Sequence, residues 1–207
     1  MKTIASKMTL AIGSTLLALT SAFGVTTADS TWSTTYALEA KGQYVQAAKD
    51  MKALLNDRQG GEFAWLRYAW LTYMSRDYNN SVAAYRKAAS LNPSSIEARL
   101  GLTLPLMAQE KWVETSSVLE QVLKTDPWNY TAHSRLIYIE SLLEKWPVLE
   151  KHAADVSARF PSDVSTLLYL AYAKDRLNKV DESKAIYKKV LERYPGHQTA
   201  VAYLAKH

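Results

Sequence analysis

Apolar and small side chains recur along most of the chain at the spacing of helices. In one stretch Tyr68, Ala69 and Thr72 are followed, beyond a polar turn, by Ala84 and Ala88. Spacings of three and four residues place such side chains on one face of a helix, whereas a half-buried strand would alternate at every second residue. The pattern predicts pairs of antiparallel helices, each of about 12 to 14 residues, joined by tight polar turns.

This helical pattern repeats at a fixed interval. Pro93, Pro127, Pro161 and Pro195 each stand 34 residues after the previous one. Proline cannot continue a helix, so each is expected just beyond the second helix of a pair. Large apolar side chains keep the same interval at Tyr44, Tyr78, Trp112, Trp146 and Val180. A period of this kind indicates an array in which every unit packs on its neighbours.

The 34-residue unit resembles the tetratricopeptide repeat (TPR). That family has a Trp, a Leu-Gly pair and a Tyr on the first helix, an Ala and an aromatic residue on the second, and a closing Pro. The best matches are Trp65, Tyr68, Ala69, Ser81, Tyr85 and Pro93 in one unit, and Leu170, Ala171, Ser183, Tyr187 and Pro195 in another. In the fourth unit Ile137 and Leu149 are bulkier than the family pattern where the two helices touch, which predicts altered packing there.

The resemblance covers residues 29–207 and implies an all-α fold, a right-handed α-solenoid of about five helix-turn-helix repeats. The expected repeats are approximately 28–61, 62–95, 96–129, 130–163 and 164–197, followed by a capping helix at 197–206. A terminal helix of this kind covers the apolar side of the last repeat.

The N-terminus has the pattern of an export signal. A short basic start is followed by an apolar stretch, and small residues precede Asp29. We therefore expect residues 1–28 to be a cleaved signal peptide, with Ala22 and Gly24 as alternative cleavage points, and a periplasmic mature protein. An uncleaved membrane anchor is the competing interpretation, although the apolar stretch is near the lower limit for spanning a bilayer.

Composition excludes several kinds of chemistry. The chain has no cysteine, so it has neither disulfides nor thiolate metal sites. The formal charge is +5, but basic and acidic residues are interspersed, which argues against a nucleic-acid-binding surface. The sequence contains no phosphate-binding glycine loop, no His pair with metal spacing and no nucleophile motif. We expect no enzymatic activity, no cofactor and no metal, and a mature form that does not span the membrane.

The TPR resemblance implies that the first helices line a concave groove. Residues at the groove-facing positions are largely apolar or aromatic, and the candidate partner-binding set is Trp32, Tyr36, Leu66, Trp70, Tyr73, Leu104, Met107, Tyr138 and Tyr172. An exposed apolar stripe usually marks an interface. We therefore expect a scaffold or adaptor that binds an apolar peptide or helix of a protein partner, in envelope assembly or secretion. The alternative is a polysaccharide-binding component of an exopolysaccharide secretion system, because aromatic faces stack on sugars.

Overall fold

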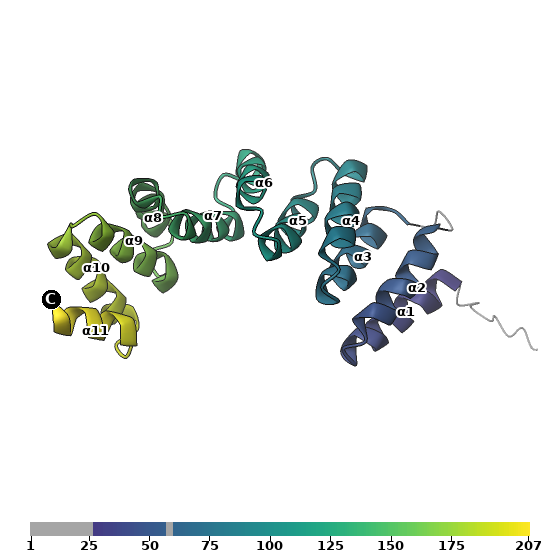
Figure 1. The fold of residues 1–207 in the computed structure, drawn as a ribbon, viewed down its shortest axis with the longest axis horizontal. Coiled ribbons are helices and arrows are strands. Elements are labelled where there is room, and N and C mark those ends of the chain that lie inside the picture. Colours follow the sequence, from purple (N-terminus) through teal and green to yellow (C-terminus); the bar gives the residue numbers. More distant parts are fainter. Residues whose placement is uncertain (1–26, 57–59) are drawn as a thin grey trace, which may run out of the picture.

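The computed structural model describes residues 27–56 and 60–207, and all regular structure in these ranges is α-helical. The helices run in the order α1 (Thr27–Ala40), α2 (Tyr44–Asn56), α3 (Glu62–Met74), α4 (Tyr78–Leu91), α5 (Ile96–Ala108), α6 (Trp112–Thr125), α7 (Tyr130–Leu142), α8 (Trp146–Arg159), α9 (Val164–Arg176), α10 (Val180–Arg193) and α11 (Gln198–Lys206). They form an open arch of stacked pairs, with α1 and α11 at opposite ends (Figure 1). The predicted all-α solenoid of five helix pairs and a closing helix is confirmed. Most of the expected signal peptide lies outside the described residues.

A left-handed backbone residue ends the first helix of every pair. Gly42, Arg76, Glu110, Glu144 and Asn178 have φ values between 53° and 71°, and they stand 34 residues apart. In each case the following backbone N–H donates to the carbonyl five residues earlier, as Lys111 does to Leu106 at 2.9 Å. This is the Schellman pattern, which satisfies carbonyls left free at a helix end and turns the chain back on itself. The periodic turns therefore have one common geometry.

Polar caps fix where the first helices begin. The side chains of Ser95, Asn129 and Asp163 accept hydrogen bonds from the backbone N–H groups of Ala98, Ala132 and Thr166, at 3.1, 3.0 and 3.3 Å. Each capping residue lies two positions after one of the periodic prolines. The proline ends one helix and the cap starts the next, so the connection between repeats is short and has a defined direction.

Small side chains let the two helices of a repeat approach each other. Ser81 and Ser183 are fully buried and donate hydrogen bonds to the carbonyls of Ala69 and Ala171, at 2.8 and 2.9 Å. In the fourth repeat these positions belong to the buried Ile137 and Leu149. There α7 and α8 have far less close backbone contact than α3 with α4 or α9 with α10, in line with the expected change of packing.

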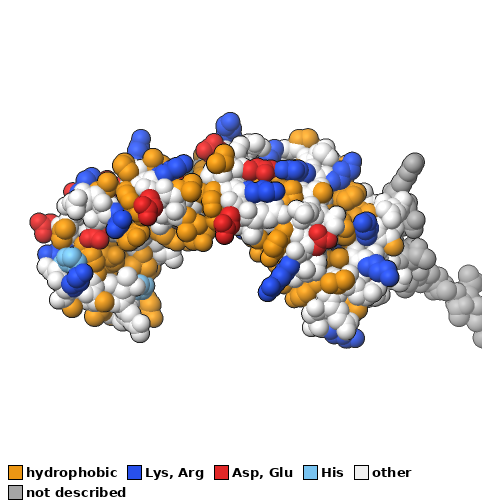
Figure 2. Space-filling model, in the orientation of Figure 1, with side chains coloured by type: hydrophobic (Ala, Val, Ile, Leu, Met, Phe, Trp, Pro, Cys, Tyr) orange, Lys and Arg blue, Asp and Glu red, His pale blue; other side chains and the backbone are white. Residues whose placement is uncertain are grey.

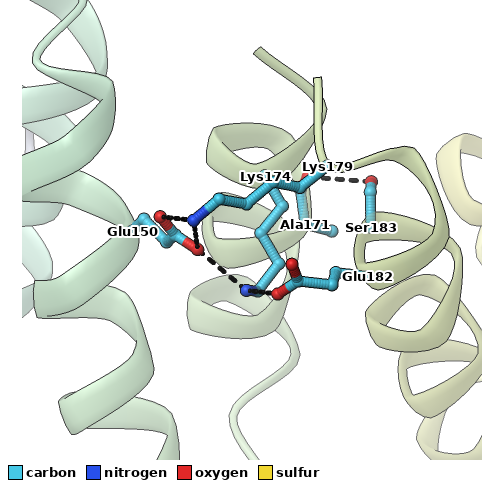
Figure 3. A network of polar contacts seen from close by, with 6 residues as sticks. All are labelled: Glu150, Ala171, Lys174, Lys179, Glu182 and Ser183. Atoms are coloured by element: carbon cyan, nitrogen blue, oxygen red, sulfur yellow. Dashed lines mark hydrogen bonds and ion pairs between the residues drawn. The ribbon is translucent and has the colours of Figure 1, made fainter. Parts of the chain in front are cut away.

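Ion pairs join the second helix of the fourth repeat, α8, to the fifth repeat. Glu150 of α8 accepts from Lys174 of α9 and from Lys179 of the next turn, each at 2.8 Å, and Lys174 also pairs with Glu182 of α10 (Figure 3). The hydrogen bonds from the two lysines hold the pKa of Glu150 below its ordinary value. This network fixes α8 on α9 and α10, whereas the contact between α7 and α8 depends on other residues.

Candidate functional site: two pockets of the concave groove

The concave side of the arch is hollowed between its two ends, and apolar side chains gather along it (Figure 2). Its N-terminal part holds a pocket of about 600 Å³ built mainly by the first helices of the repeats, as predicted. Its lining residues are Tyr36, Phe63, Leu66, Arg67, Trp70, Tyr85, Ile96, Glu97, Leu100, Gly101, Leu104, Thr131 and Arg135. A space of this size suits a few side chains of a peptide or a small ligand.

Four of the predicted groove residues meet in this pocket: Tyr36, Leu66, Trp70 and Leu104. Leu66 is buried at its base, while Tyr36 is 49% exposed at its rim. Trp32 does not line the pocket itself, but its ring stacks on that of Phe63, with centroids 5.1 Å apart. The groove is therefore aromatic at the end where the sequence placed its strongest apolar stripe.

A partly buried ion pair supports the aromatic wall. Arg67 is only 8% exposed and donates from Nη1 to Glu39 Oε2, while Trp70 Nε1 donates to Glu39 Oε1 at 2.7 Å. Burial raises the pKa of Glu39, but the hydrogen bonds from Trp70 and Arg67 outweigh it and hold the pKa below its ordinary value. Trp70 is thus part of the α1–α3 contact as well as of the groove surface.

The guanidinium of Arg67 is more than a partner for Glu39. It lies against the ring of Tyr36, 3.9 Å from the ring centroid, which is a cation–π contact. Its Nε and Nη2 groups are buried and have no hydrogen-bond partner. Buried donors without acceptors are uncommon and each costs about 1–3 kcal/mol. This part of the wall therefore has donor capacity that the protein itself does not use.

A second arginine projects from α7 into the same pocket. Arg135 donates from Nη1 to the backbone carbonyl of Leu100 at 2.6 Å and to Thr103 Oγ1, both of which are neutral oxygens. Burial lowers the pKa of its guanidinium below the ordinary value. No carboxylate of the described chain pairs with it. A half-buried positive charge therefore faces the groove without an ion pair in the described chain, although the carboxylate of Glu97 lines the same pocket.

The C-terminal part of the groove holds a second pocket, of about 420 Å³, with no charged side chain in its lining. It is lined by Ser141, Ser165, Leu168, Tyr169, Tyr172, Tyr187 and Thr199, from α7, α9, α10 and α11. Tyr172 is the one predicted groove residue that it contains. The burial of Tyr187 raises its pKa to about 12, so this wall presents neutral hydroxyls and aromatic rings.

Besides Trp32, three of the predicted groove residues line neither pocket. Tyr73 packs among the rings of Trp70 and Tyr78, and Met107 is half-buried on α5. Tyr138, although 39% exposed, meets the ring of Trp112 edge-on at 6.4 Å. Tyr172 likewise meets Trp146 of the preceding repeat edge-on, at 5.3 Å. Part of the aromatic stripe therefore joins neighbouring repeats as well as facing the groove.

The sequence analysis missed the two arginines, although their spacing contains a signal. Arg67, Gly101, Arg135 and Tyr169 stand 34 residues apart, and all four line one of the two pockets. The nearest predicted groove position in the second repeat is Leu66, one residue before Arg67, and the predicted set contains none of these four residues. A charged residue that recurs at a groove-lining position was the available clue.

Within the described residues, no group of three or more His, Asp or Glu side chains could hold a metal ion. None of the described helices has the length and hydropathy needed to cross a membrane.

The fold and the grooved concave face are those of a helical-repeat scaffold. Tetratricopeptide-repeat family models match residues 64–95 and 165–197. The chain therefore contains tetratricopeptide repeats in these two regions.

Solved structures share this fold at low sequence identity. MamA from Desulfovibrio magneticus RS-1 (residues 41 to the end) is 15% identical, with a TM-score of 0.72 over 82% of this chain and 96% of that one. A tetratricopeptide repeat protein from Parabacteroides merdae is 14% identical, with a TM-score of 0.75 over 86% and 71%. A thermophilic TPR protein from Thermus thermophilus is 17% identical, with a TM-score of 0.54 over 86% and 96%. No curated protein matches the chain. These likenesses show the fold and not the ligand.

Proposed function

We propose that the chain is an exported, non-catalytic scaffold that binds a segment of a protein partner in the N-terminal pocket of its groove. The observation that carries this proposal is the combination of aromatic walls with Arg135, a half-buried cation that forms no ion pair in the described chain. Aromatic side chains and arginine are the residues that most often dominate protein interfaces. The partner segment is accordingly apolar, with one acidic side chain placed opposite Arg135.

Export and a periplasmic role in envelope assembly or secretion belong to the same proposal. Their support is the basic start, the apolar stretch and the small residues before Asp29 in the sequence. Mass measurement of the mature protein tests this part, because removal of residues 1–28 predicts a chain that begins at Asp29. Full-length protein retained in the inner membrane would support the anchor instead.

Selection of random 12-residue peptides on the mature protein tests the groove. We expect the selected peptides to be apolar and aromatic with one Asp or Glu. Changing that acid to its amide, or introducing Arg135→Gln, should each weaken binding at least tenfold, equal to about 1.4 kcal/mol. The two changes together should cost little more than either alone, because both remove the same charge pair. Glutamine keeps a donor for the Leu100 carbonyl, so this variant tests the charge and not the hydrogen bond.

Tyr172→Ala provides the matched control, since Tyr172 contributes to the C-terminal pocket and to the contact with Trp146 but does not line the N-terminal pocket, and peptide affinity should be unchanged. Selected peptides without an acid, or with equal affinity for Arg135→Gln, would contradict the proposed partner chemistry.

A second candidate function is binding of a polysaccharide, and the C-terminal pocket favours it. Its lining of tyrosine rings and neutral hydroxyls suits stacking on sugar faces and hydrogen bonding to sugar hydroxyls. A series of soluble oligosaccharides that binds the wild type and loses affinity with Tyr172→Ala, but not with Arg135→Gln, would establish this function in place of peptide binding.

A further inference from the structure

The fourth repeat holds a line of titratable side chains where other repeats hold different, mostly apolar residues. His133 and Glu140 lie on α7, and His152 lies on α8. The same positions are Trp65, Thr72 and Ala84 in the second repeat and Leu167, Lys174 and Ile186 in the fifth. His133, Glu140 and His152 therefore lie in the interface between α7 and α8, the two helices that Ile137 and Leu149 keep from close approach.

These side chains form one continuous hydrogen-bonded chain between α7 and α8. His133 Nε2 lies 3.0 Å from the Pro127 carbonyl oxygen, and His133 Nδ1 lies 2.8 Å from His152 Nε2. His152 Nδ1 in turn lies 2.9 and 3.0 Å from the two carboxylate oxygens of Glu140. His133 is 8% exposed, and the side chains of His152 and Glu140 are 16% and 15% exposed. Water has little access to replace any of these links.

Counting the ring protons shows which charge state of the two histidines allows every hydrogen bond of this series to form. The Pro127 carbonyl can only accept, so His133 Nε2 must carry a hydrogen, and Nδ1 of a neutral His133 then accepts from His152 Nε2–H. An ionised Glu140 also only accepts, so His152 Nδ1 must carry a hydrogen too. The two rings together then hold three ring protons and one positive charge. With two protons one link is lost, and with four protons two N–H groups face each other across 2.8 Å.

We propose that this hydrogen-bonded series of His133, His152 and Glu140 is a pH-sensitive latch. It holds α7 against α8 most firmly while the two histidines share a single positive charge. Loss of that charge breaks a link, and gain of a second charge drives the two rings apart. Helix α7 lines both pockets, through Arg135 and Ser141, so the state of the latch determines how rigidly α7 is held against α8 and the repeat that follows.

The charged surroundings are consistent with a single charge. The groups that act on His133 are His152, Asp126 in the turn before α7, and Glu140. Burial of His133 lowers its pKa most, and the neighbouring His152 lowers it further. The hydrogen bond to the Pro127 carbonyl and the two carboxylates act in the opposite direction without outweighing these effects. The cations of the next repeat, Lys174 and Lys179, pair with Glu150 and not with Glu140. Glu140 is therefore left to pair with the histidines.

The sign of the pH dependence follows from the proton numbers of the two states. In the folded latch the pair holds one proton beyond the neutral rings, whereas in the unfolded chain it holds from none to two as pH falls through the ordinary imidazole pKa of about 6.5. Above that pH the folded state binds more protons, so stability falls as pH rises. Below it the unfolded state binds more, so stability falls as pH falls. The latch therefore contributes most to the free energy of unfolding near pH 6.5. On either side of this pH the unfolding constant rises by up to about tenfold per pH unit.

Urea unfolding of the full chain between pH 5 and 8 tests the latch. The comparison is between wild type and the double variant His133→Gln, His152→Gln, in which neither side chain titrates. We expect the wild type to be most stable relative to the double variant between pH 6 and 7. This difference in stability should become smaller at both lower and higher pH. His207→Gln, at the end of the chain, is the matched control and should keep the wild-type profile. A flat ratio, or one that changes in a single direction, would overturn the proposal.

Nitrogen NMR of the wild-type histidine rings gives an answer even if the double variant does not fold. Near pH 6.5 the latch requires a proton on Nε2 alone in His133 and on both nitrogens in His152. Two neutral rings, or two doubly protonated rings, would equally rule it out.

Discussion

The two groove pockets are the same site built twice, three repeats apart, with different chemistry. A shift of 102 residues converts Leu66, Trp70 and Tyr85 of the N-terminal pocket into Leu168, Tyr172 and Tyr187 of the C-terminal one. The aromatic and aliphatic frame is thereby kept. Buried Tyr85 and Tyr187 even share a pKa raised to about 12 by burial.

The first pocket also has Arg135, which has no counterpart in the second, and the shared frame differs at three further positions. Phe63, Arg67 and Glu97 of the first pocket correspond to Ser165, Tyr169 and Thr199 of the second. Every charged group at these positions has become a neutral hydroxyl. The repeat period therefore decides where a pocket forms, and a few lining residues decide what it can bind.

Deletion of α11, by ending the chain at Gly196, should have the largest effect on this comparison. The helix supplies Thr199 to the C-terminal pocket, and its Tyr203 ring packs on Tyr187 with centroids 4.3 Å apart. Loss of the fully buried Ala200 and of the half-buried rings around it should cost about 3 kcal/mol of unfolding free energy. Urea denaturation followed by circular dichroism measures this. Peptide affinity at the N-terminal pocket should survive, and its loss would show that the two pockets depend on one another.

Gly101→Ala should damage the N-terminal pocket selectively. A Cβ at Gly101 would lie 2.2 Å from Tyr85 Cε1, so the buried ring would have to move. Overpacking of this kind costs about 1–3 kcal/mol, and the displaced ring belongs to the pocket wall. We expect a lower urea midpoint together with weaker peptide binding. Gly196→Ala is the control, because a Cβ there meets no atom within 4 Å; equal effects of the two variants would refute the packing argument.

Glycine substitution at the left-handed turns should have the smallest effect, and it should be stabilising. Arg76 and Asn178 have φ values of 64° and 60° at equivalent turns of the two halves. Glycine adopts this conformation without strain, whereas Asn tolerates it better than Arg. We expect Arg76→Gly to raise the unfolding free energy by about 1 kcal/mol and Asn178→Gly by less. Thermal unfolding of both variants checks the order, and a destabilised Arg76→Gly would mean that the Arg76 side chain contributes contacts of its own.

The sequence was sufficient for the fold because the fold is a repeated local unit. Pro93 and its three successors close four of the five units, and Ser81 and Ser183 mark the close helix contacts in two of them. The site was predictable only in part. Leu66 and Trp70 follow from helical phase, but Arg67 lies one residue beyond the predicted groove position, and its role depends on Glu39 from another repeat. Likewise, His133 and His152 are 19 residues apart, and their contact depends on how two helices pack.

The weak packing of α7 on α8 has a mechanical consequence. In a linear array each repeat contacts only its neighbours, so a force applied to the two ends passes through every interface in series. Ile137 and Leu149 keep this pair from the close approach seen where Ser81 meets Ala69, while α8 is tied by ion pairs to the repeat that follows it. Under tension the arch should therefore open readily between α7 and α8. Opening there would separate the arginine-lined pocket from α9, α10 and α11, which carry all of the hydroxyl-lined pocket except Ser141.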